Sequence, residues 1–600
     1  MKIYTKLARL LVAPLIFTVM MVSTVNATEP AEPAEDPLSL LGSLRDVNIN
    51  DHLPNLDGIV VDTYAAKKLG KALFWDTQVG SDGQACASCH FRAGVDPRIT
   101  NQLTPGHLLE LRDIQGDGTP GDDEFGGLVS GDANTNPYDL SPPGSAGLTA
   151  GGQTARANIT VTPDDFPFHQ LEDVNDRNSA IVYTTNDAMS SAGTFGGSFQ
   201  NIVPGSAIDD CKPAEQFSHI FQTSTGHPTR RVEPRQAAGT VNAIFMFDTF
   251  WDGRAKNAFN GVDPFGLRTV AAGKAKILKR KGSDLAPVDL KNTHGEFLKN
   301  FSAASQALGP VLSDHEMSCS GRTFAHVGKK LLRNDLRPLQ QQEVHPDDSL
   351  LGPLRNSDGM GLNKNYTQLI RAAFHADYWA ISGTWKFDNM NPPTPSPDGF
   401  TQMEHNMSMF FGIAVALYES TLISDETRFD DFIEGDHSAL NPSEKRGLDI
   451  FLGQGNCIAC HTTAAFTKAS TLHLNAENQE EGLVEFMQMA EGSVVSAFYD
   501  NGFYNIGVRP TVMDILRGAE DGFGIPLSFT RQFLQHRPFA ITLADQNFTD
   551  MFQVDPCTFE VIPSGASAAN CDTNTELQFI LDNILHMDLE RKAVDGAAKT

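Results

Sequence analysis

Two five-residue stretches hold the side chains best suited to chemistry. They are Cys86-Ala87-Ser88-Cys89-His90, the first pentad, and Cys457-Ile458-Ala459-Cys460-His461, the second pentad. In each, two thiols can add to the vinyl groups of one haem, and the adjacent histidine can ligate its iron. A thioredoxin-like redox pair or a shared four-cysteine zinc site would not explain a histidine directly after the second cysteine in both places. The sequence therefore predicts two covalently bound haem c groups, attached through Cys86, Cys89, Cys457 and Cys460 and ligated by His90 and His461.

The start of the chain has the features of an export signal. Basic residues precede an apolar run from Leu10 to Val22, and Val25-Asn26-Ala27 offers small residues to a signal peptidase. We predict a signal peptide over residues 1–27 and a periplasmic protein, with association with the cell surface as a variant of that location. Because this run is short and other apolar stretches carry charges, we expect no membrane span.

Four cysteines lie outside the pentads: Cys211, Cys319, Cys557 and Cys571. An even remainder suggests disulfides in an oxidising compartment. A Cys557–Cys571 bond would close a short loop and stabilise the fold by about 3 kcal/mol. Cys211–Cys319 is then the second pair that we expect.

The formal net charge of −28 over 600 residues argues against nucleic acid or anionic lipid as a partner. Solubility explains most of that charge, and electrostatic steering toward a basic electron-donor protein is a second interpretation. The length predicts two or three domains.

Helical patterns precede both pentads. A helix beginning near Asp62 should place Tyr64, Leu69, Leu73 and Phe74 on one face before the first pentad. Before the second pentad, Asn441-Pro442-Ser443-Glu444 has an N-cap, a first-turn proline and a capping-box glutamate. That helix should carry three apolar side chains toward the second pentad, namely Leu448, Ile450 and Phe451.

Composition also predicts one buried helix and two insertion-like stretches. Residues 403–424 should form one helix with a single buried stripe of Met403, Met407, Phe410, Ala414 and Leu417. From about Arg112 to Asp210, Gly, Asp, Asn, Ser and Thr predominate, which predicts loops with little regular structure. Residues 274–299 are a second, basic and polar stretch that resembles an insertion.

Three segments between the pentads carry candidate acid–base and aromatic groups. They are Thr225-Gly226-His227 followed by Arg235-Gln236-Ala237, then Phe250-Trp251-Asp252-Gly253-Arg254, and Gln306-Ala307-Leu308-Gly309-Pro310-Val311 leading to Glu316. A haem protein that only carries electrons has no use for an acid beside its iron. An enzyme that splits an O–O bond needs one to move a proton between the two oxygens.

With these segments the chain resembles the bacterial di-haem cytochrome c peroxidases and their relatives of the methylamine-dehydrogenase-maturing (MauG) type. The resemblance includes Leu69-Gly70-Lys71-Ala72-Leu73-Phe74, the segment 250–254, and Arg446-Gly447-Leu448 with Phe451. It covers about half of the chain, in family order, with long insertions between the matching parts.

The resemblance implies roles residue by residue. His90 and His461 are the proximal iron ligands, and His227 is the distal ligand that caps the N-terminal haem at rest. Trp251 is the inter-haem tryptophan, while Gln306 and Glu316 are the distal glutamine and the catalytic glutamate. Gln236 stands where the family has an asparagine that ligates calcium, so the resemblance also suggests a calcium ion between the domains.

The implied fold is mainly α, with two cytochrome c-like haem domains and long irregular loop insertions. The domains expected are a signal peptide (1–27), a Pro/Glu-rich leader (28–55), a peroxidatic haem domain (56–395) with insertions at about 112–210 and 260–302, and a truncated electron-transfer haem domain (396–600). The family's distal ligand of the second haem would follow residue 600, which is why we expect the end to be incomplete.

The implied activity is reduction of hydrogen peroxide to water with electrons from a donor cytochrome or cupredoxin, by an oxidoreductase that can form homodimers. Two alternatives remain open. One is MauG-like oxidation of a protein or an organic substrate, and the other is a di-haem cytochrome that only transfers electrons.

The first prediction concerns the cofactor. Protein made in a host that attaches haem c should carry two haem groups per chain, measured by intact mass and by the pyridine haemochrome spectrum. Fewer than two groups would contradict the interpretation of the pentads.

Overall fold

The computed structural model describes residues 37–104, 160, 163, 169–174, 179, 181–184, 188–213, 221, 227–233, 235–388, 391–475, 483–488, 496–504 and 516–535. The predicted signal peptide, the Cys557–Cys571 pair and the predicted truncated end lie outside the described residues. In the described part, α-helices form the core and short strands lie around it, as expected for a mainly α protein.

The α-helices are α1 (Thr63–Trp75), α2 (Cys86–Cys89), α3 (Leu267–Ala271), α4 (Ser302–Gln306), α5 (Leu308–Leu312), α6 (Phe324–Leu331), α7 (Tyr366–Ala373), α8 (Gln402–His405), α9 (Met407–Glu419), α10 (Arg428–Ile433), α11 (Pro442–Leu452), α12 (Thr471–Leu474) and α13 (Phe529–Gln535). The strands are β1 (Leu103–Thr104), β2 (His169–Leu171), β3 (Ile181–Thr184), β4 (Ala188–Met189), β5 (Ser198–Asn201), β6 (Asp210–Lys212), β7 (Ile277–Lys281), β8 (Asp284–Val288), β9 (Trp385–Lys386), β10 (Thr394–Pro395), β11 (Val484–Gln488) and β12 (Ser496–Asp500).

Helix α1 begins where the sequence predicts. The side chain of Asp62 caps it by accepting a hydrogen bond from the Ala65 N–H at 3.0 Å. Leu69, Leu73 and Phe74 are buried. Tyr64 is 50% exposed, so the predicted apolar face is wrong at that position. The reason is helix geometry: at about 100° per residue, Tyr64 lies about 140° around the helix from Leu69 and about 180° from Leu73, so it faces away from them.

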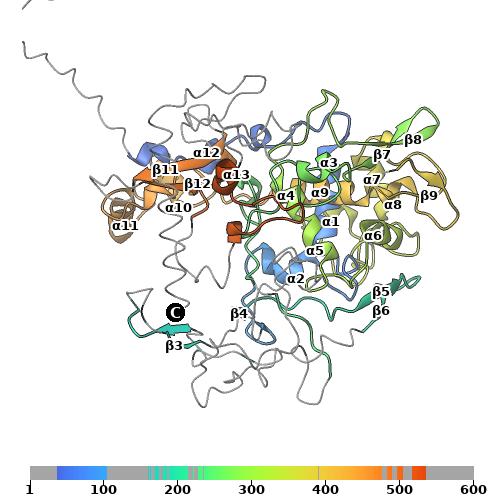
Figure 1. The fold of residues 1–600 in the computed structure, drawn as a ribbon, viewed down its shortest axis with the longest axis horizontal. Coiled ribbons are helices and arrows are strands. Elements are labelled where there is room, and N and C mark those ends of the chain that lie inside the picture. Colours follow the sequence, from blue (N-terminus) through green and yellow to red (C-terminus); the bar gives the residue numbers. More distant parts are fainter. Residues whose placement is uncertain are drawn as a thin grey trace, which may run out of the picture.

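Helix α9 lies at the centre of the larger group of helices (Figure 1). All thirteen of its residues are buried, because α1, α4, α5 and α6 pack around it. The prediction of a single buried stripe is therefore wrong. The predicted continuous helix is also wrong, since α8 and α9 meet at Asn406, whose side-chain amide donates to the carbonyls of Leu278 and Tyr378. This buried amide links the helix break to the segments that precede α8.

The contact between α1 and α9 is very close. A methyl group added at Gly70 of α1 would lie 1.8 Å from the carbonyl oxygen of Ala414 in α9. Glycine is therefore required at this crossing for steric reasons. Helix α9 was expected in the C-terminal domain, yet it shares one core with α1, α4, α6 and α7.

Short strands occur where the sequence predicts only loops. β5 pairs with β6, and β2 pairs with β3, inside the stretch that composition predicts to be irregular. The basic stretch 274–299 contains the antiparallel hairpin β7–β8. These hairpins have too few residues for a clear alternation of polar and apolar side chains, so the composition signal hid them.

Residues 37–55, the last part of the predicted Pro/Glu-rich leader, are folded in the structure. They form three short 3₁₀ helices, and Leu41 and Leu44 are buried. The Ser43 hydroxyl donates to Asp430 of α10 at 2.9 Å. The leader as predicted therefore extends too far, because its last part packs on the C-terminal helices.

The second pentad belongs to a smaller group of elements, which contains α10, α11, α12 and the hairpin β11–β12 (Figure 1). Helix α11 begins as predicted, since the Asn441 side chain caps it, Pro442 is its first residue and Glu444 completes the capping box. Ile450 is 49% exposed on this helix. None of the helices in the described part of the chain is both long and apolar enough to cross a bilayer.

The packing of α1 on α9 generates the second prediction. Gly70→Ala should lower the free energy of unfolding by about 3 kcal/mol, because the added methyl group overpacks the core. The matched control is Gly447→Ala in α11, where an added methyl group meets open space among the described residues. It should raise the stability by about 1 kcal/mol. Thermal and urea unfolding of both variants measures the difference, and equal effects would contradict it.

Candidate functional site

The first pentad places its histidine in a defined orientation. The Nδ1–H of His90 donates to the carbonyl oxygen of Ala238 at 2.6 Å. The other ring nitrogen, Nε2, then keeps its lone pair for a metal. Burial lowers the pKa of His90, which favours the neutral imidazole that can ligate iron.

The second pentad has the same arrangement. The Nδ1–H of His461 donates to the carbonyl oxygen of Phe466 at 3.0 Å. Cys457 lies at the start of a 3₁₀ turn that ends at Ala459. In both pentads a backbone carbonyl therefore selects the imidazole nitrogen that can bind iron.

A phenylalanine packs beside each of these histidines. The Phe74 and His90 rings are 6.2 Å apart at 42°, and the Phe451 and His461 rings are 6.3 Å apart at 44°. Each phenylalanine lies four residues after a glycine, Gly70 or Gly447, in the helix before its pentad. Sequence reasoning missed this repeated Gly-x-x-x-Phe spacing, although it is visible in the sequence.

These features fit covalently attached haem. Cys86 and Cys89 form no disulfide in the described structure, whereas Cys211 and Cys319 do, as predicted. Burial raises the pKa of the Cys86 thiol to about 12, so the free thiol is neutral at neutral pH. A thioether bond to a haem vinyl group would remove that ionisation altogether.

Glu316 lies close to the first pentad. Its negative charge contributes to raising the pKa of both Cys86 and Cys89, although burial of the two thiols is the larger cause. Glu316 is half-buried in the loop after α5, and the Ser313 hydroxyl oxygen accepts hydrogen bonds from the N–H groups of His315 and Glu316. The structure thus brings the predicted acid to the predicted haem site.

Gln306 is the last residue of α4, which packs against the segment that leads to Trp251. The Ser302 hydroxyl donates to the Met246 carbonyl at 2.6 Å. Further along, a Cβ at Gly309 would lie 2.9 Å from the Phe250 ring. The segment with Gln306 and the segment 250–254 are therefore in direct contact.

Trp251 is tied to the first pentad through a short stretch of backbone. Its indole N–H donates to the Gln236 carbonyl at 3.1 Å, two residues before the carbonyl that holds His90. Arg235 and Arg254 both pair with Asp252, at 3.1 and 2.8 Å. Burial disfavours the charged form of Asp252, but the two arginines prevail and lower its pKa.

The residues just before Trp251 touch the segment after the second pentad. The Phe247 N–H donates to the Ala469 carbonyl at 2.9 Å, and Met246 bridges to Ser470. Trp251 therefore belongs to a segment, residues 246–251, that contacts residues next to the first pentad and residues after the second pentad. It is 59% exposed in the polypeptide, so it is not an ordinary core residue.

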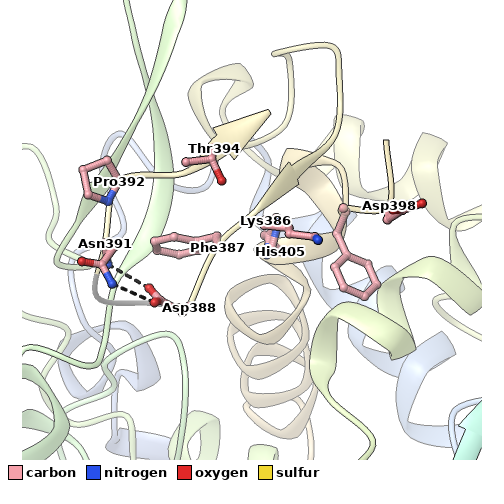
Figure 2. Close-up of a pocket in the computed structure, with 10 residues that line it drawn as sticks. Lys386, Phe387, Asp388, Asn391, Pro392, Thr394, Asp398 and His405 are labelled. Carbon is pink, nitrogen blue, oxygen red and sulfur yellow. Dashed lines mark hydrogen bonds between the residues drawn. The ribbon is translucent and has the colours of Figure 1, made fainter. Parts of the chain in front are cut away.

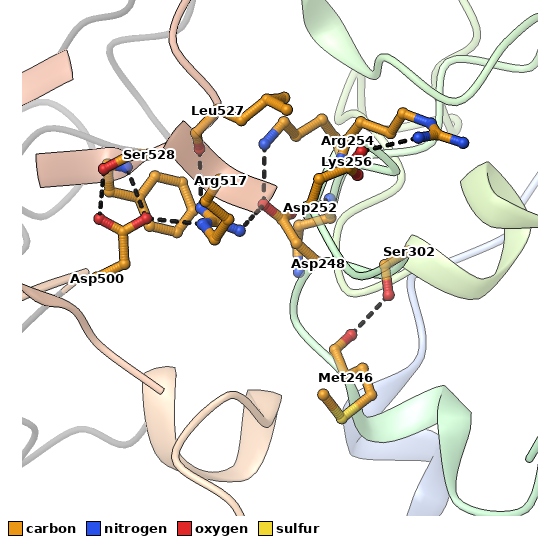
Figure 3. Close-up of polar contacts among 12 residues, drawn as sticks. Met246, Asp248, Asp252, Arg254, Lys256, Ser302, Asp500, Arg517, Leu527 and Ser528 are labelled. Carbon is orange, nitrogen blue, oxygen red and sulfur yellow. Dashed lines mark hydrogen bonds and ion pairs between the residues drawn. The ribbon is translucent and has the colours of Figure 1, made fainter. Parts of the chain in front are cut away.

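Buried ion pairs join the segment around Asp248 to the C-terminal elements (Figure 3). Asp248 pairs with Lys256 at 3.0 Å and with Arg517 at 3.5 Å. Arg517 also pairs with Asp500 at 2.7 Å. A Cβ at Gly253 would lie 2.0 Å from the Arg517 guanidinium, which explains the glycine in the segment 250–254.

The structure does not test two of the predicted ligands. His227 is exposed, and its surroundings are only partly described. Within the described residues, no three His, Cys, Asp or Glu side chains are grouped to hold a metal ion. The distal role of His227 and the calcium role of Gln236 stay predictions.

One pocket of about 400 Å³ lies away from the pentads, at β9 and β10 (Figure 2). Phe387, Phe400 and His405 line it together with Asp388 and Asn391, whose side chains hydrogen bond at 2.8 Å. No pentad residue borders this pocket. It is therefore separate from the site of the predicted chemistry.

Comparison with known proteins matches residues 210–438 to the di-haem cytochrome c peroxidase family. The match covers 229 of the 600 residues, so it shows a similarity of this segment to that family. The match confirms the resemblance seen in the sequence, and it contains His227, Gln236, Trp251, Gln306 and Glu316.

Individual relatives of the peroxidase and MauG types match shorter stretches. The methylamine utilization protein MauG of Methylorubrum extorquens is 44% identical over 57 residues, which are 10% of this chain and 16% of that protein. The cytochrome-c peroxidase IdrP2 of Denitromonas iodatirespirans is 40% identical over 62 residues, 10% of this chain and 17% of that protein. The cytochrome c551 peroxidase of Nitrosomonas europaea is 42% identical over 52 residues, 9% and 15% of the two chains. The aligned stretches thus span about a sixth of each relative.

A further buried acid next to the first pentad escaped sequence reasoning. Glu419, the last residue of α9, is 3% exposed, and no hydrogen bond to its carboxyl group is found within the described residues. Its charge contributes, after burial, to raising the pKa of Cys86. Burial raises the pKa of Glu419 itself to about 8. Nothing in the local pattern marks Glu419 as buried, because a glutamate at the end of an apolar helix usually lies on the surface.

Glu419 generates the third prediction. Its pKa is higher in the folded protein than in the unfolded chain, so folding binds the proton more tightly. The resulting stabilisation is present below about pH 4.5 and is lost as the pH rises through about 8. Glu419→Gln keeps the neutral shape, so its melting temperature relative to the native protein should increase from about pH 5 to about pH 9. A difference that does not change with pH would contradict the buried position of Glu419.

Proposed function

We propose that this protein is a di-haem c-type peroxidase that reduces hydrogen peroxide to water with electrons from a donor cytochrome or cupredoxin. The observation that carries the proposal is the position of Glu316, whose charge acts on both cysteines of the first pentad. The family match of residues 210–438 supports the same class of oxidoreductase. The periplasm, reached through the predicted signal peptide, is the proposed location.

The proposed layout has one haem in each of two parts of the chain. The larger part begins near residue 56, and the shared core of α1 and α9 argues for a boundary after Glu419 rather than at residue 395. The smaller part then contains α10, α11 and the second pentad. When bound, the two haems would supply the path for electrons and the iron at which peroxide is reduced.

Glu316 and Gln306 would carry out the proton chemistry. The Glu316 carboxylate takes the proton from one peroxide oxygen and returns it to the departing oxygen, which therefore leaves as water and not as hydroxide. Gln306 orients the peroxide with a hydrogen bond from its side-chain amide. His90 keeps its Nε2 directed to the metal because Ala238 accepts its other N–H.

Trp251 would lie on the electron route between the two pentads. The hydrogen bond to Gln236 fixes its indole ring beside the backbone that holds His90. The preceding residues contact the segment that follows His461. An aromatic side chain in this position shortens the distance that an electron must cross between the two parts.

The fourth prediction tests the acid. Glu316→Gln should reduce the rate of peroxide turnover by ~10²–10⁴-fold while both haems stay attached, because the amide cannot accept the proton. The matched control is Glu426→Gln, the same change at an exposed site, which should leave turnover unchanged. Steady-state assays with a reduced donor cytochrome, together with the haemochrome spectrum, measure both. Full activity of Glu316→Gln would remove this residue from the reaction.

Peroxide titration separates the proposed function from its alternatives. The ferric and half-reduced proteins are titrated with hydrogen peroxide and followed by optical and EPR spectroscopy. A peroxidase consumes peroxide in proportion to the electrons supplied by the donor. Absence of any response at either haem would instead identify a protein that only transfers electrons, and turnover that requires a protein or organic substrate would identify MauG-like oxidation.

A further inference from the structure

The loop that carries Glu316, residues 313–320, is held by a distant segment of the chain, residues 190–212, which we call the brace. The Thr194 N–H donates to the His315 carbonyl at 3.0 Å, immediately before Glu316. On the other side of the acid, the Phe199 N–H donates to the Ser320 carbonyl at 2.9 Å, and the Ser320 N–H donates to the Gly197 carbonyl at 2.8 Å. Backbone hydrogen bonds from the brace thus flank the acid on both sides.

Gly193 is the point of closest approach. A Cβ atom at this position would lie 1.9 Å from the His315 carbonyl oxygen and 2.8 Å from the Cα of Glu316. Both neighbours are backbone atoms, so they cannot move aside as a flexible side chain would. A larger residue at position 193 must therefore change the spacing between the brace and the backbone of Glu316.

Arg231 connects the brace to the same loop, because it hydrogen bonds to both Gly193 and Asp314. Its backbone carbonyl accepts the Gly193 N–H at 2.8 Å. Its guanidinium donates to the Asp314 carboxylate at 2.7 Å and to the Asp314 carbonyl at 3.1 Å. Burial disfavours the charged form of Asp314, yet the hydrogen bond with His315 and the charge of Arg231 lower its pKa well below the ordinary value.

Covalent and ionic contacts anchor the far end of the brace. Cys211 forms a disulfide with Cys319, three residues after Glu316. Asp209 pairs with Arg322 and Lys330, each at 3.1 Å, and the side chains of all three are fully buried. Breaking such a buried set of charges is costly, so this end of the brace is fixed.

The brace also contacts the residues that lead into the first pentad. The Gln84 side-chain amide donates to the Gly193 carbonyl at 3.0 Å. The Asp82 carboxylate accepts hydrogen bonds from the Thr194 hydroxyl and the Phe195 N–H, both at 2.8 Å. One segment therefore sets the position of the acid-bearing loop relative to the haem attachment site.

We propose that the brace positions Glu316 over the first haem site, with Gly193 and Arg231 as positioning residues. This inference rests on the proposed function, since it assumes that Glu316 moves the proton. It assigns a role to the last part of the stretch that composition predicts to be an irregular insertion.

The fifth prediction tests Gly193. Gly193→Ala should slow the reaction of the protein with hydrogen peroxide by about 100-fold, because a shift of about 1 Å misplaces the acid. In a Glu316→Gln background the same substitution should hardly change the rate further, because its effect depends on the carboxylate that this background already lacks. The matched control is Gly522→Ala, an exposed glycine whose added methyl group meets open space among the described residues, and it should have no effect in either background.

A second readout does not depend on activity. Hydrogen–deuterium exchange of the peptide that contains residues 313–320 should be faster in Gly193→Ala, and unchanged in Gly522→Ala, with both haems retained in each variant. Arg231→Gln provides the second variant if Gly193→Ala does not fold. It frees Asp314 without adding bulk, and we expect about a tenfold loss of rate that also disappears in the Glu316→Gln background.

The possible outcomes distinguish the two proposals. Full activity of Glu316→Gln overturns the proposed function and this inference with it. If Glu316→Gln is inactive but Gly193→Ala and Arg231→Gln keep the native rate, the inference alone is overturned. If Gly193→Ala lowers the rate by the same factor with and without the Glu316 carboxylate, the inference is also overturned. The brace would then stabilise the fold in general and would not position this acid.

Discussion

The hydrogen bond from His90 to the carbonyl of Ala238 is the contact on which the arrangement of the site depends. It fixes which imidazole nitrogen is available to iron, and it holds the stretch 235–240 against the first pentad. Through the Gln236 carbonyl the same stretch orients Trp251, and through Arg235 it pairs with Asp252. A single run of backbone therefore orients both the His90 imidazole and the Trp251 indole.

Around this contact, segments that are far apart in the sequence meet at the first pentad. Glu316 arrives after α5, Glu419 at the end of α9, and Gly193 from the brace. Two of these three are acids with different surroundings. Glu316 is half-buried in a loop with hydrogen-bonding neighbours, whereas Glu419 is buried at a helix end and has a raised pKa. The raised pKa of about 8 keeps the Glu419 carboxyl group largely protonated at neutral pH.

Much of this could be predicted because it follows local rules. The pentads, the caps at Asp62 and Asn441 and the Cys211–Cys319 disulfide depend on residue types at short spacings or on simple pairing of the remaining cysteines. The failures depend on contacts between distant segments. The burial of α9 on all sides, the folding of residues 37–55 on α10 and the role of Gly193 arise from neighbours that no local pattern reveals. The predicted roles of His227 and Gln236 rest on the resemblance, since the described structure neither supports nor opposes them.

The position of α9 has a consequence for biogenesis. Helix α1 ends at Trp75, but the helix that fits against Gly70 does not begin until Met407. Contacts with so large a separation along the chain form late and slowly. The emerging polypeptide cannot complete its central core until Glu419 has been translated. Until then the part of the core that Cys86 and its neighbours pack against is incomplete, so the thiols of Cys86 and Cys89 stand on unpacked chain.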